Sequence, residues 1–204
     1  MSAEHGHARS PARIRDRATT DAAAKPYHHG NLAAAAVAAA EDEIVEHGIA
    51  AASLRRVAER AGVSHTAVGK RFGDKAGLLA AVAAEGYRLL GDALEGAAPD
   101  MRAMGRAYLA FAVARPALFT VMFQPAVYRA ADPGVVAASA RTTSMLQAGV
   151  GQTDRSATAD VALGAWAFVH GLASLVLGQA IGGDPLELFE RTVDAVFRDG
   201  PPAV

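Results

Sequence analysis

The residues best suited to chemistry in this sequence are the cations and hydroxyls of residues 53–75. This segment contains six lysine and arginine residues and two acidic residues. Its local charge is therefore six minus two, or +4, in a chain whose formal net charge is −1. Binding to a phosphate backbone requires localised positive charge of this kind. The segment is therefore a candidate nucleic-acid contact, and the alternative is an ordinary solvated helix face.

The spacing within this segment predicts two short helices joined by a turn. Ser53 can cap the first helix, whose apolar positions recur at helical intervals, and Gly62 can supply the positive φ that ends it. Ser64 can then cap a second helix that extends to Arg71. Such a helix enters the major groove with its N-terminal end first. Its exposed side chains should be His65, Thr66 and Lys70, with Ala67 and Val68 packed inward.

Composition indicates an all-α protein without thiol chemistry. Hydrophobic residues make up 51% of the 204 residues and aromatic ones only 6%, and alanine-rich runs such as residues 32–40 favour helix. No alternating apolar run bounded by turns predicts a strand. The absence of cysteine excludes disulfides, thiolate metal sites and cysteine nucleophiles.

Enzymatic motifs and metal-ligand patterns do not occur in the sequence. It has no nucleophile elbow, phosphate-binding loop or HExxH motif, so we expect neither an enzyme nor a cofactor. His5, His7, His28 and His29 lack carboxylate or cysteine partners at ligand spacing, which argues against a metal site. A small helical enzyme that uses His170 is the remaining catalytic alternative.

Turn and capping residues divide the sequence into two tails and two folded regions. Residues 1–26 lack hydrophobic periodicity and predict a disordered tail, with a basic arm along DNA as the alternative. Residues 27–74 form the expected three-helix DNA-binding domain. Residues 75–198 form a second, helical domain, and residues 199–204 a C-terminal tail.

The start of each helix follows from capping residues and prolines. Asn31 is expected to cap a first helix over residues 32 to about 47, ended by Gly48. Later helices are expected to begin near residues that cap or bound them, namely Lys75, Asp100, Pro116, Pro133, Asp154 and Pro185.

Residues 161–183 carry no charged side chain over a length that could cross a bilayer. A histidine, several glycines and the lack of a basic flank argue against a membrane span. We interpret the segment as a helix buried on one side by its own domain and on the other by a partner subunit. The last two helices, about 154–178 and 185–198, are then the expected homodimer interface. Because no apolar signal segment begins the sequence, we expect a cytoplasmic protein.

The second region contains methionine and aromatic side chains of the kind that adapts to apolar ligands. Burial in the core is the more common role of each such residue. His170 either bonds a neighbouring group or offers a polar contact to a ligand, and we favour the first. The candidates for an effector pocket are Met101, Met104, Phe111, Met122, Phe123, Trp166 and His170.

The sequence resembles the tetracycline-repressor (TetR) family of bacterial transcription regulators over residues 27–198. The resemblance is carried by YHHGNL at residues 27–32, AGVSHTA at 61–67, RFGDKAGLLAAVAAEGYRLL at 71–90, AYLAFAVARPALFTVMF at 107–123 and WAFVHGLASLVL at 166–177. These motifs are similar to those of a large subgroup whose C-terminal half is named for its Trp and His-Gly motif.

The resemblance implies a homodimer in which each subunit places one helix-turn-helix on half of a palindromic operator. It also implies a repressor that a small-molecule effector, held in the C-terminal half, releases from DNA. By position it implies phosphate contacts from Ser53 and Lys75, and base contacts from Arg55 and the start of the second helix. The expected DNA contacts are Ser53, Arg55, Ser64, His65, Thr66, Lys70, Arg71 and Lys75. A DNA-binding architectural protein without a ligand is the alternative.

Gly69 departs from the family pattern, in which a tyrosine usually packs and hydrogen-bonds a phosphate at this position. Glycine provides neither contact, and inside a helix it costs about 1 kcal/mol relative to alanine. We expect specific binding that is weaker and steeply dependent on salt, with Lys70 and Arg71 replacing the lost contact by charge. If about six phosphates are neutralised per dimer, the logarithmic salt slope is about −5.

Overall fold

The computed structural model describes residues 29–148 and 155–197, with side chains over 32–146 and 160–197. This part of the chain contains nine α-helices, one short 3-10 helix and no strand, so the predicted all-α class is confirmed. The helices are α1 His29–Ala51, α2 Leu54–Arg60, α3 His65–Phe72, α4 Lys75–Ala97, α5 Met101–Ala114, α6 Pro116–Met122, η1 Pro125–Val127, α7 Pro133–Ala148, α8 Arg155–Leu177 and α9 Pro185–Phe197. The predicted tails, 1–26 and 199–204, lie outside the described residues.

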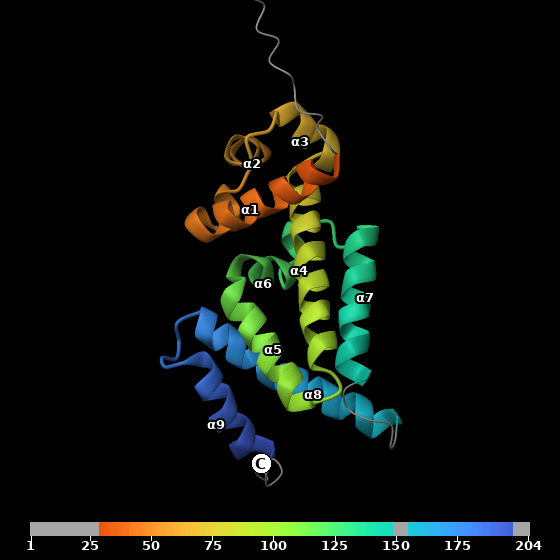
Figure 1. The fold of residues 1–204 in the computed structure, drawn as a ribbon, viewed down its shortest axis with the longest axis vertical. Helices are drawn as coiled ribbons and strands as arrows, with labels where there is room; N and C mark the ends of the chain where they lie inside the picture. Colours follow the sequence, from red (N-terminus) through yellow and green to blue (C-terminus); the bar gives the residue numbers. More distant parts are fainter. Residues whose placement is uncertain (1–28, 149–154, 198–204) are drawn as a thin grey trace, which may run out of the picture.

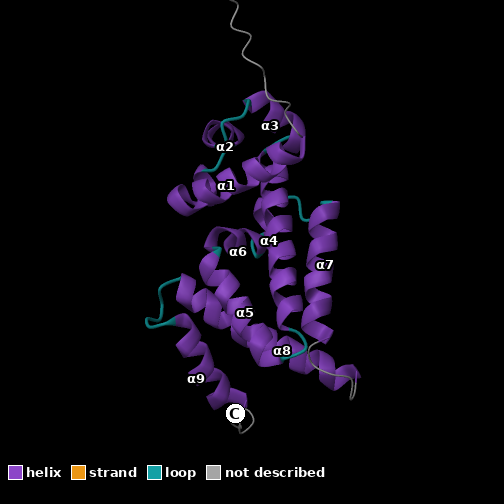
Figure 2. Ribbon diagram, in the orientation of Figure 1, coloured by secondary structure: helices purple, strands orange, loops and turns teal. Residues whose placement is uncertain are grey.

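The helices form a small end and a larger end that α4 connects. Helices α1, α2 and α3 lie together at one end, and α4 runs from them into the larger half with α7 alongside (Figures 1 and 2). Helices α8 and α9 lie at the opposite end from α2 and α3 (Figure 1). Helix α4 is therefore the element that joins the two ends.

Most predicted helix starts are confirmed, and each has a local cause. The side chains of Ser53, Ser64 and Asp184 accept hydrogen bonds from backbone N–H groups three residues later, at 3.3, 3.0 and 2.9 Å. Asp100 accepts from the N–H of Arg102 at 2.8 Å. Proline begins α6, α7 and α9, where its missing N–H has no helical partner to lose.

The predicted start of the first helix is wrong, whereas the predicted break at Gly48 is confirmed. Helix α1 begins at His29, so Asn31 lies within it rather than capping it. Gly48 has the positive φ that ends a helix, +78°, but one further turn follows it to Ala51. The first helix is therefore kinked at Gly48, and the kink brings the chain to Ser53.

One continuous core joins the two ends of the molecule. Val57, Val68 and Phe72 are buried at the small end, and α4 contributes a row of buried side chains along its length, from Leu78 to Leu94. These residues belong to the same cluster as the buried side chains of α5, α6, α8 and α9. Because α4 packs against α1 and α3 at the small end and against α5, α6 and α7 in the larger half, it is a rigid connection rather than a flexible linker.

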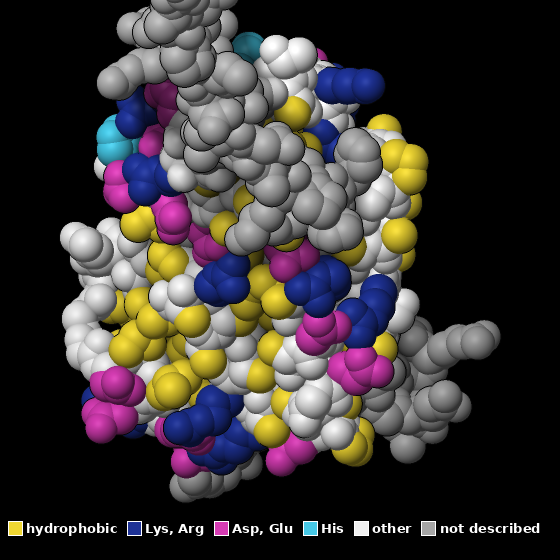
Figure 3. All heavy atoms as spheres, turned by 45° about the horizontal axis from the view of Figure 1, so that its top comes forward, with side chains coloured by type: hydrophobic (Ala, Val, Ile, Leu, Met, Phe, Trp, Pro, Cys, Tyr) yellow, Lys and Arg dark blue, Asp and Glu magenta, His cyan; other side chains and the backbone are white. Residues whose placement is uncertain are grey.

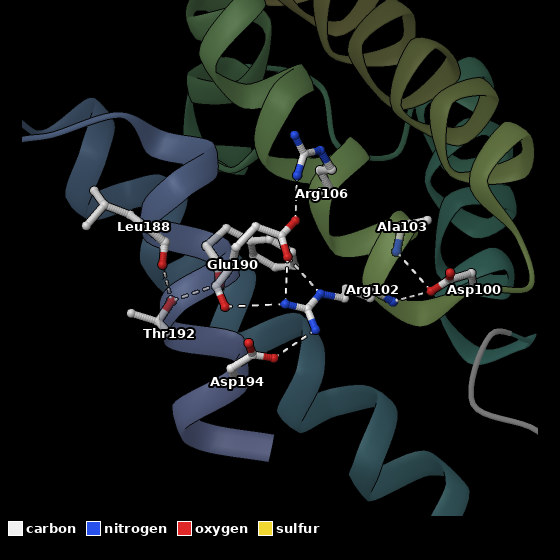
Figure 4. A network of polar contacts seen from close by, with 9 residues as sticks. Asp100, Arg102, Ala103, Arg106, Leu188, Glu190, Thr192 and Asp194 are labelled. Carbon is white, nitrogen blue, oxygen red and sulfur yellow. Dashed lines mark hydrogen bonds and ion pairs between the residues drawn. The ribbon is translucent and has the colours of Figure 1, made fainter. Parts of the chain in front are cut away.

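Helix α9 is fixed to α5 by a ring and by ion pairs. Phe189 is 2% exposed and lies against Gly105, where an added Cβ would come within 2.8 Å of the ring. Around it, Glu190 accepts from Arg102 at 2.7 Å and from Arg106 at 2.5 Å, and Asp194 accepts from Arg102 at 2.8 Å (Figure 4). This contact positions α9 on the outside of α5.

Helix α8 has one buried face and one exposed apolar face. Val169, Leu172 and Ala173 are buried against the core, whereas Leu163 is 58% exposed and Leu175 47%. Within the described residues, 160–177 is the one stretch long and apolar enough to cross a membrane, and a single such helix is weak evidence for a span. One side of α8 is thus buried by its own domain, as predicted, and the opposite side is exposed.

Candidate nucleic-acid interface and interior cavities

The turn between α2 and α3 is held by backbone hydrogen bonds that glycine makes possible. Gly62 has a φ of +64°, its N–H donates to the carbonyl of Glu59 at 3.2 Å, and the N–H of Val63 donates to that of Ala58 at 3.0 Å. This pair of bonds is the Schellman arrangement that closes a helix at a left-handed residue. The predicted end of the first short helix and the turn after it are therefore confirmed.

Helix α3 buries one face and exposes the other. Val68 is fully buried and Phe72 is 6% exposed, so both hold the helix on the core. The exposed side chains include four of the predicted DNA contacts, which are His65, Thr66, Lys70 and Arg71. Ser64 is exposed as well, but its hydroxyl accepts the capping bond from the N–H of Ala67.

Two arginines counted toward the local positive charge are bound to carboxylates of α1. Glu43 is 4% exposed and accepts from Arg56 Nε at 2.6 Å and from Arg60 Nε at 2.8 Å. Glu46 also accepts from Arg60, at 2.8 Å. The local charge of +4 was counted without these α1 carboxylates, so it overstates the positive charge available to phosphate. Figure 3 shows cationic and acidic side chains next to each other over the described surface. These two arginines brace α2 on α1.

Three other predicted DNA contacts already have partners within the chain. Ser53 caps α2, and Lys75, half-buried, donates from Nζ to the carbonyl of Ala50 at 2.8 Å. Arg55 pairs with Glu59 at 3.0 Å, but its side chain is 81% exposed, so solvent screens the pair. An ammonium has three N–H donors, which leaves Lys75 two for a phosphate.

The junction between α3 and α4 is a tight turn whose positive φ favours glycine. Gly73 adopts φ +79° and ψ −70°, and the N–H of Asp74 donates to the carbonyl of Phe72 at 3.0 Å, which makes a γ-turn. Asp74 then accepts from the N–H of Gly77 at 2.9 Å and from Arg129 at 2.7 Å. The orientation of α3 relative to α4 is therefore set by this turn.

Gly69 lies on α3 with open space around it, because an added Cβ would meet no atom within 4 Å. We expect Gly69→Ala to raise the free energy of unfolding by about 0.5–1 kcal/mol, since alanine restricts the unfolded chain and suits a helix. Urea unfolding of the two proteins measures the difference. A loss of stability would show that α3 requires glycine for a reason outside this packing.

Carboxylates at the small end make its stability depend on pH. Hydrogen bonds from Arg56 and Arg60 lower the pKa of Glu43, that from Arg60 lowers the pKa of Glu46, and the N–H of Gly77 followed by Arg129 lowers the pKa of Asp74. A carboxyl whose pKa is lowered by folding stabilises the fold above its unfolded pKa, roughly 4, and loses that contribution as the pH falls through its folded pKa.

The contribution of these carboxylates to the free energy of unfolding should therefore be constant above about pH 5.5 and decline below about pH 4. Glu43→Gln should lower stability at pH 7 and reduce the slope at acidic pH, as followed by urea unfolding at pH 7, 5, 4 and 3. The matched control is Asp42→Asn, at an exposed neighbour on the same helix. An unchanged slope in Glu43→Gln would contradict the assignment.

The larger half contains two cavities that divide the predicted effector residues between them. A cavity of about 490 Å³ between α5, α8 and α9 is lined by Met101 and Met104, and one of about 370 Å³ between α4, α6, α7 and α8 is lined by Met122 and Phe123. Trp166 lines both. Volumes of this size suit small molecules.

Two of the predicted effector residues line neither cavity. Phe111 is 8% exposed and packs in the core. His170 Nδ1 lies 2.9 Å from the hydroxyl of Tyr108, so it bonds a neighbouring side chain, which was the favoured alternative. Burial lowers the pKa of His170 and keeps the ring neutral. Five of the seven predicted residues thus line the two cavities, and their contact with an effector stays a prediction.

The polar residues of the cavity walls were not predicted, and four of them carry tyrosine or threonine hydroxyls considered below. Tyr87, Tyr108, Tyr128 and Thr142 come from four different helices or loops, and no local spacing relates them. The positions of their hydroxyl groups relative to one another depend on the tertiary packing of α4, α5 and α7. A sequence search that included tyrosine with the other aromatic residues would have found three of them.

Both halves of the chain are similar to known proteins. Residues 36–82 match the family described as bacterial regulatory proteins, tetR family, and residues 101–196 match the tetracyclin repressor-like C-terminal domain. A protein with unknown function from Rhodococcus sp. RHA1 is 32% identical with a TM-score of 0.71, and the match covers 86% of this chain and 98% of that one.

Two further solved structures share the fold at lower identity. A bacterial regulatory protein in the tetR family from Rhodococcus RHA1 is 23% identical with a TM-score of 0.62, over 84% of this chain and 98% of its own. The TetR family regulator PfmR from Thermus thermophilus is 20% identical with a TM-score of 0.60, over 83% of this chain and 99% of its own. No curated protein is significantly similar to the chain.

Proposed function

The chain belongs to the tetracycline-repressor (TetR) family of bacterial transcription regulators, and we propose that it is a homodimeric repressor which a small-molecule effector releases from a palindromic operator. It is a DNA-binding transcriptional regulator and not an enzyme. The observation that carries the proposal is the exposed start of α3, where His65 and Thr66 project from a helix held by the buried Val68 and Phe72.

The exposed residues of α2 and α3 have the chemistry that the two kinds of DNA contact require. His65 and Thr66, at the leading end of α3, can donate to or accept from base edges in the major groove. Lys70 and Arg71, one turn later, suit phosphate. Arg55 is exposed on α2 and can exchange Glu59 for a base or phosphate, and the capping hydroxyls of Ser53 and Ser64 lie at helix starts, where phosphates bind. Lys75 retains two donors for the same backbone.

The exposed face of α8 supports a homodimer through α8 and α9. Leu163 and Leu175 are exposed on α8 by 58% and 47%, and Phe197 on α9 by 48%. An added Cβ at Gly164 or Gly171 would meet nothing within 4 Å, so another helix can approach this face closely. Burial of contiguous apolar surface favours association with a second copy.

Disruption of this face is expected to separate the subunits. The double variant Leu163→Glu/Leu175→Glu should change from a dimer to a monomer in light scattering, because a second copy would bury unpaired carboxylates. Val136→Glu, at a 52% exposed position on α7, is the matched control and should remain dimeric. A double variant that stays dimeric would place the interface elsewhere.

Contacts between the second cavity and the small end support release by an effector. Tyr128 lines the cavity, and the next residue, Arg129, binds Asp74 at the start of α4. Arg115 at the start of α6 donates to Glu41 of α1 at 2.6 Å. A ligand that prefers the conformation unable to bind DNA by about 1–3 kcal/mol would produce the usual magnitude of coupling.

The location and the division of the chain into domains are part of the same proposal. We place the protein in the bacterial cytoplasm, where its operator lies. We assign residues 27–74 to DNA binding and residues 75–198 to effector binding and dimerisation, with α4 packed against both.

Selection of random duplex oligonucleotides with the purified protein tests the proposal. The expected result is a palindrome whose half-sites are separated by about one helical turn or a multiple of it, because each subunit presents one α3 to the major groove. Enrichment of no motif would indicate an architectural DNA-binding protein instead. Light scattering of the complex gives the number of subunits independently.

A further inference from the structure

The two cavities of the larger half are adjacent and share part of their walls. Tyr108, Leu146, Ala162 and Trp166 line both of them. The indole Nε1 of Trp166 donates to the hydroxyl of Tyr108 at 3.2 Å, so this pair of rings forms the partition. Tyr108 is 1% exposed, whereas Trp166 is 36% exposed and is therefore the member of the pair that can turn with less loss of packing.

The walls of the two cavities contain no free charge among the described residues. The second cavity is lined by apolar and hydroxyl side chains only. In the first, the charged side chains are Arg102 and Asp194, which pair with each other at 2.8 Å. An ionised ligand would lose its hydration here without gaining a counter-charge. The walls therefore favour an uncharged molecule.

Two tyrosine hydroxyls of the second cavity meet at one backbone carbonyl, and their protons are already engaged. Tyr87 and Tyr128 both donate to the carbonyl of Met122, at 3.0 and 2.9 Å. Thr142 donates to the carbonyl of Tyr87 at 2.9 Å. Each of these oxygens still has lone pairs that can accept a hydrogen bond. This part of the cavity is thus complementary to a ligand group that donates one.

We propose that the two cavities are the two ends of a single site for an elongated, uncharged molecule with a hydroxyl at one end. The hydroxyl donates to the oxygens of Tyr87 and Tyr128, and the apolar chain passes the Trp166 partition into the cavity between α5, α8 and α9. This inference rests on the proposed function, because it names the chemical class of the effector.

Titration with straight-chain molecules of one length and different head groups tests the chemical class. Trp166 is the only tryptophan of the chain, so its fluorescence reports occupancy of either cavity. 1-Decanol should bind at least about tenfold more tightly than decanoate or decylammonium at pH 7.5, because only the charged heads lose hydration without a partner. Equal or tighter binding of either ion would overturn the inference, as would an absence of binding by every alcohol.

A single substitution tests whether the tyrosine hydroxyls bind the ligand. Tyr87→Phe removes one acceptor, while Tyr128 still donates to the carbonyl of Met122, so the fold keeps that bond. The affinity for 1-decanol should fall about five- to tenfold, and the affinity for the methyl ether of the same length should not change. Val113→Ala, at an exposed position of α5 outside both cavities, is the control. Equal effects on alcohol and ether would show that the ring, and not the hydroxyl, determines binding.

Continuity of the site is tested by filling one end. Ala165 lines only the first cavity, and Ala165→Leu should weaken 1-dodecanol about tenfold or more while leaving 1-hexanol unchanged, because each excluded methylene costs about fourfold in affinity. Ala110→Leu, exposed on α5, is the control. Unchanged binding of 1-dodecanol would show two separate sites. Operator selection is carried out without alcohol, so its failure would refute the proposed function and leave these titrations interpretable.

Discussion

The double variant His65→Ala/Thr66→Ala is expected to lose about a thousandfold in affinity for the selected operator. Both side chains project from the start of α3, and each base contact contributes about 1 kcal/mol or more of discrimination. A dimer makes each contact twice, so four contacts are lost. Fluorescence anisotropy with the operator and with an unrelated duplex measures both affinities, and the affinity for the unrelated duplex should change by less than about twofold.

Lys70→Gln is the matched comparison, because Lys70 is exposed on the same helix but has a point charge suited to phosphate. It should weaken operator and unrelated duplex alike, and it should reduce the logarithmic salt slope by about 1.8 for two subunits. If His65→Ala/Thr66→Ala weakened both duplexes equally, these two residues would contact the backbone rather than the bases.

Gly77→Ala is expected to cause the largest loss among substitutions that add one methyl group. The new Cβ would overlap the carbonyl oxygen of Phe72 and come within 2.8 Å of Arg129 Nη1. A backbone atom cannot turn away as a flexible side chain does, so the α3–α4 turn must shift, at a cost of about 1–3 kcal/mol. Because the turn sets the direction of α3, operator affinity should also fall, even at temperatures where the variant is folded.

Urea unfolding and anisotropy separate the two effects of Gly77→Ala. Gly96→Ala is the control, because it lies on the same helix in open space and its Cβ meets nothing within 4 Å. It should leave operator affinity unchanged. A Gly77→Ala protein with normal stability and normal affinity would show that the turn is not fixed by the contact with Phe72.

Features determined by neighbouring residues could be predicted from the sequence, because their causes are local. Ser53 and Ser64 each cap a helix by accepting a hydrogen bond from the N–H three residues later. Gly62 has the positive φ that the predicted turn requires. The outward direction of His65 follows once the positions of Val68 and Phe72 are known. For this reason the helix-turn-helix and most helix starts agree with the structure.

Features that depend on the packing of distant segments could not be predicted in this way. Glu43 lies 13 residues before Arg56, and only the crossing of α1 over α2 shows that it binds two cations of the basic segment. The composition of the cavity walls depends on tertiary packing in the same way, since Tyr108 and Trp166 are 58 residues apart in the sequence. Phe111 has the residue type of a ligand contact, but its direction on α5 places it in the core.

The division of α3 into a buried and an exposed face also affects how the protein can diverge. Substitutions at the exposed positions 65, 66 and 70 should change folding stability by less than about 0.5 kcal/mol, since those side chains are not buried. The Glu43 contacts and the Gly73 turn keep the helix in the same orientation meanwhile. Duplicated copies of the gene can thus change the DNA sequence that they bind without first losing the fold, and each copy keeps the same two interior cavities.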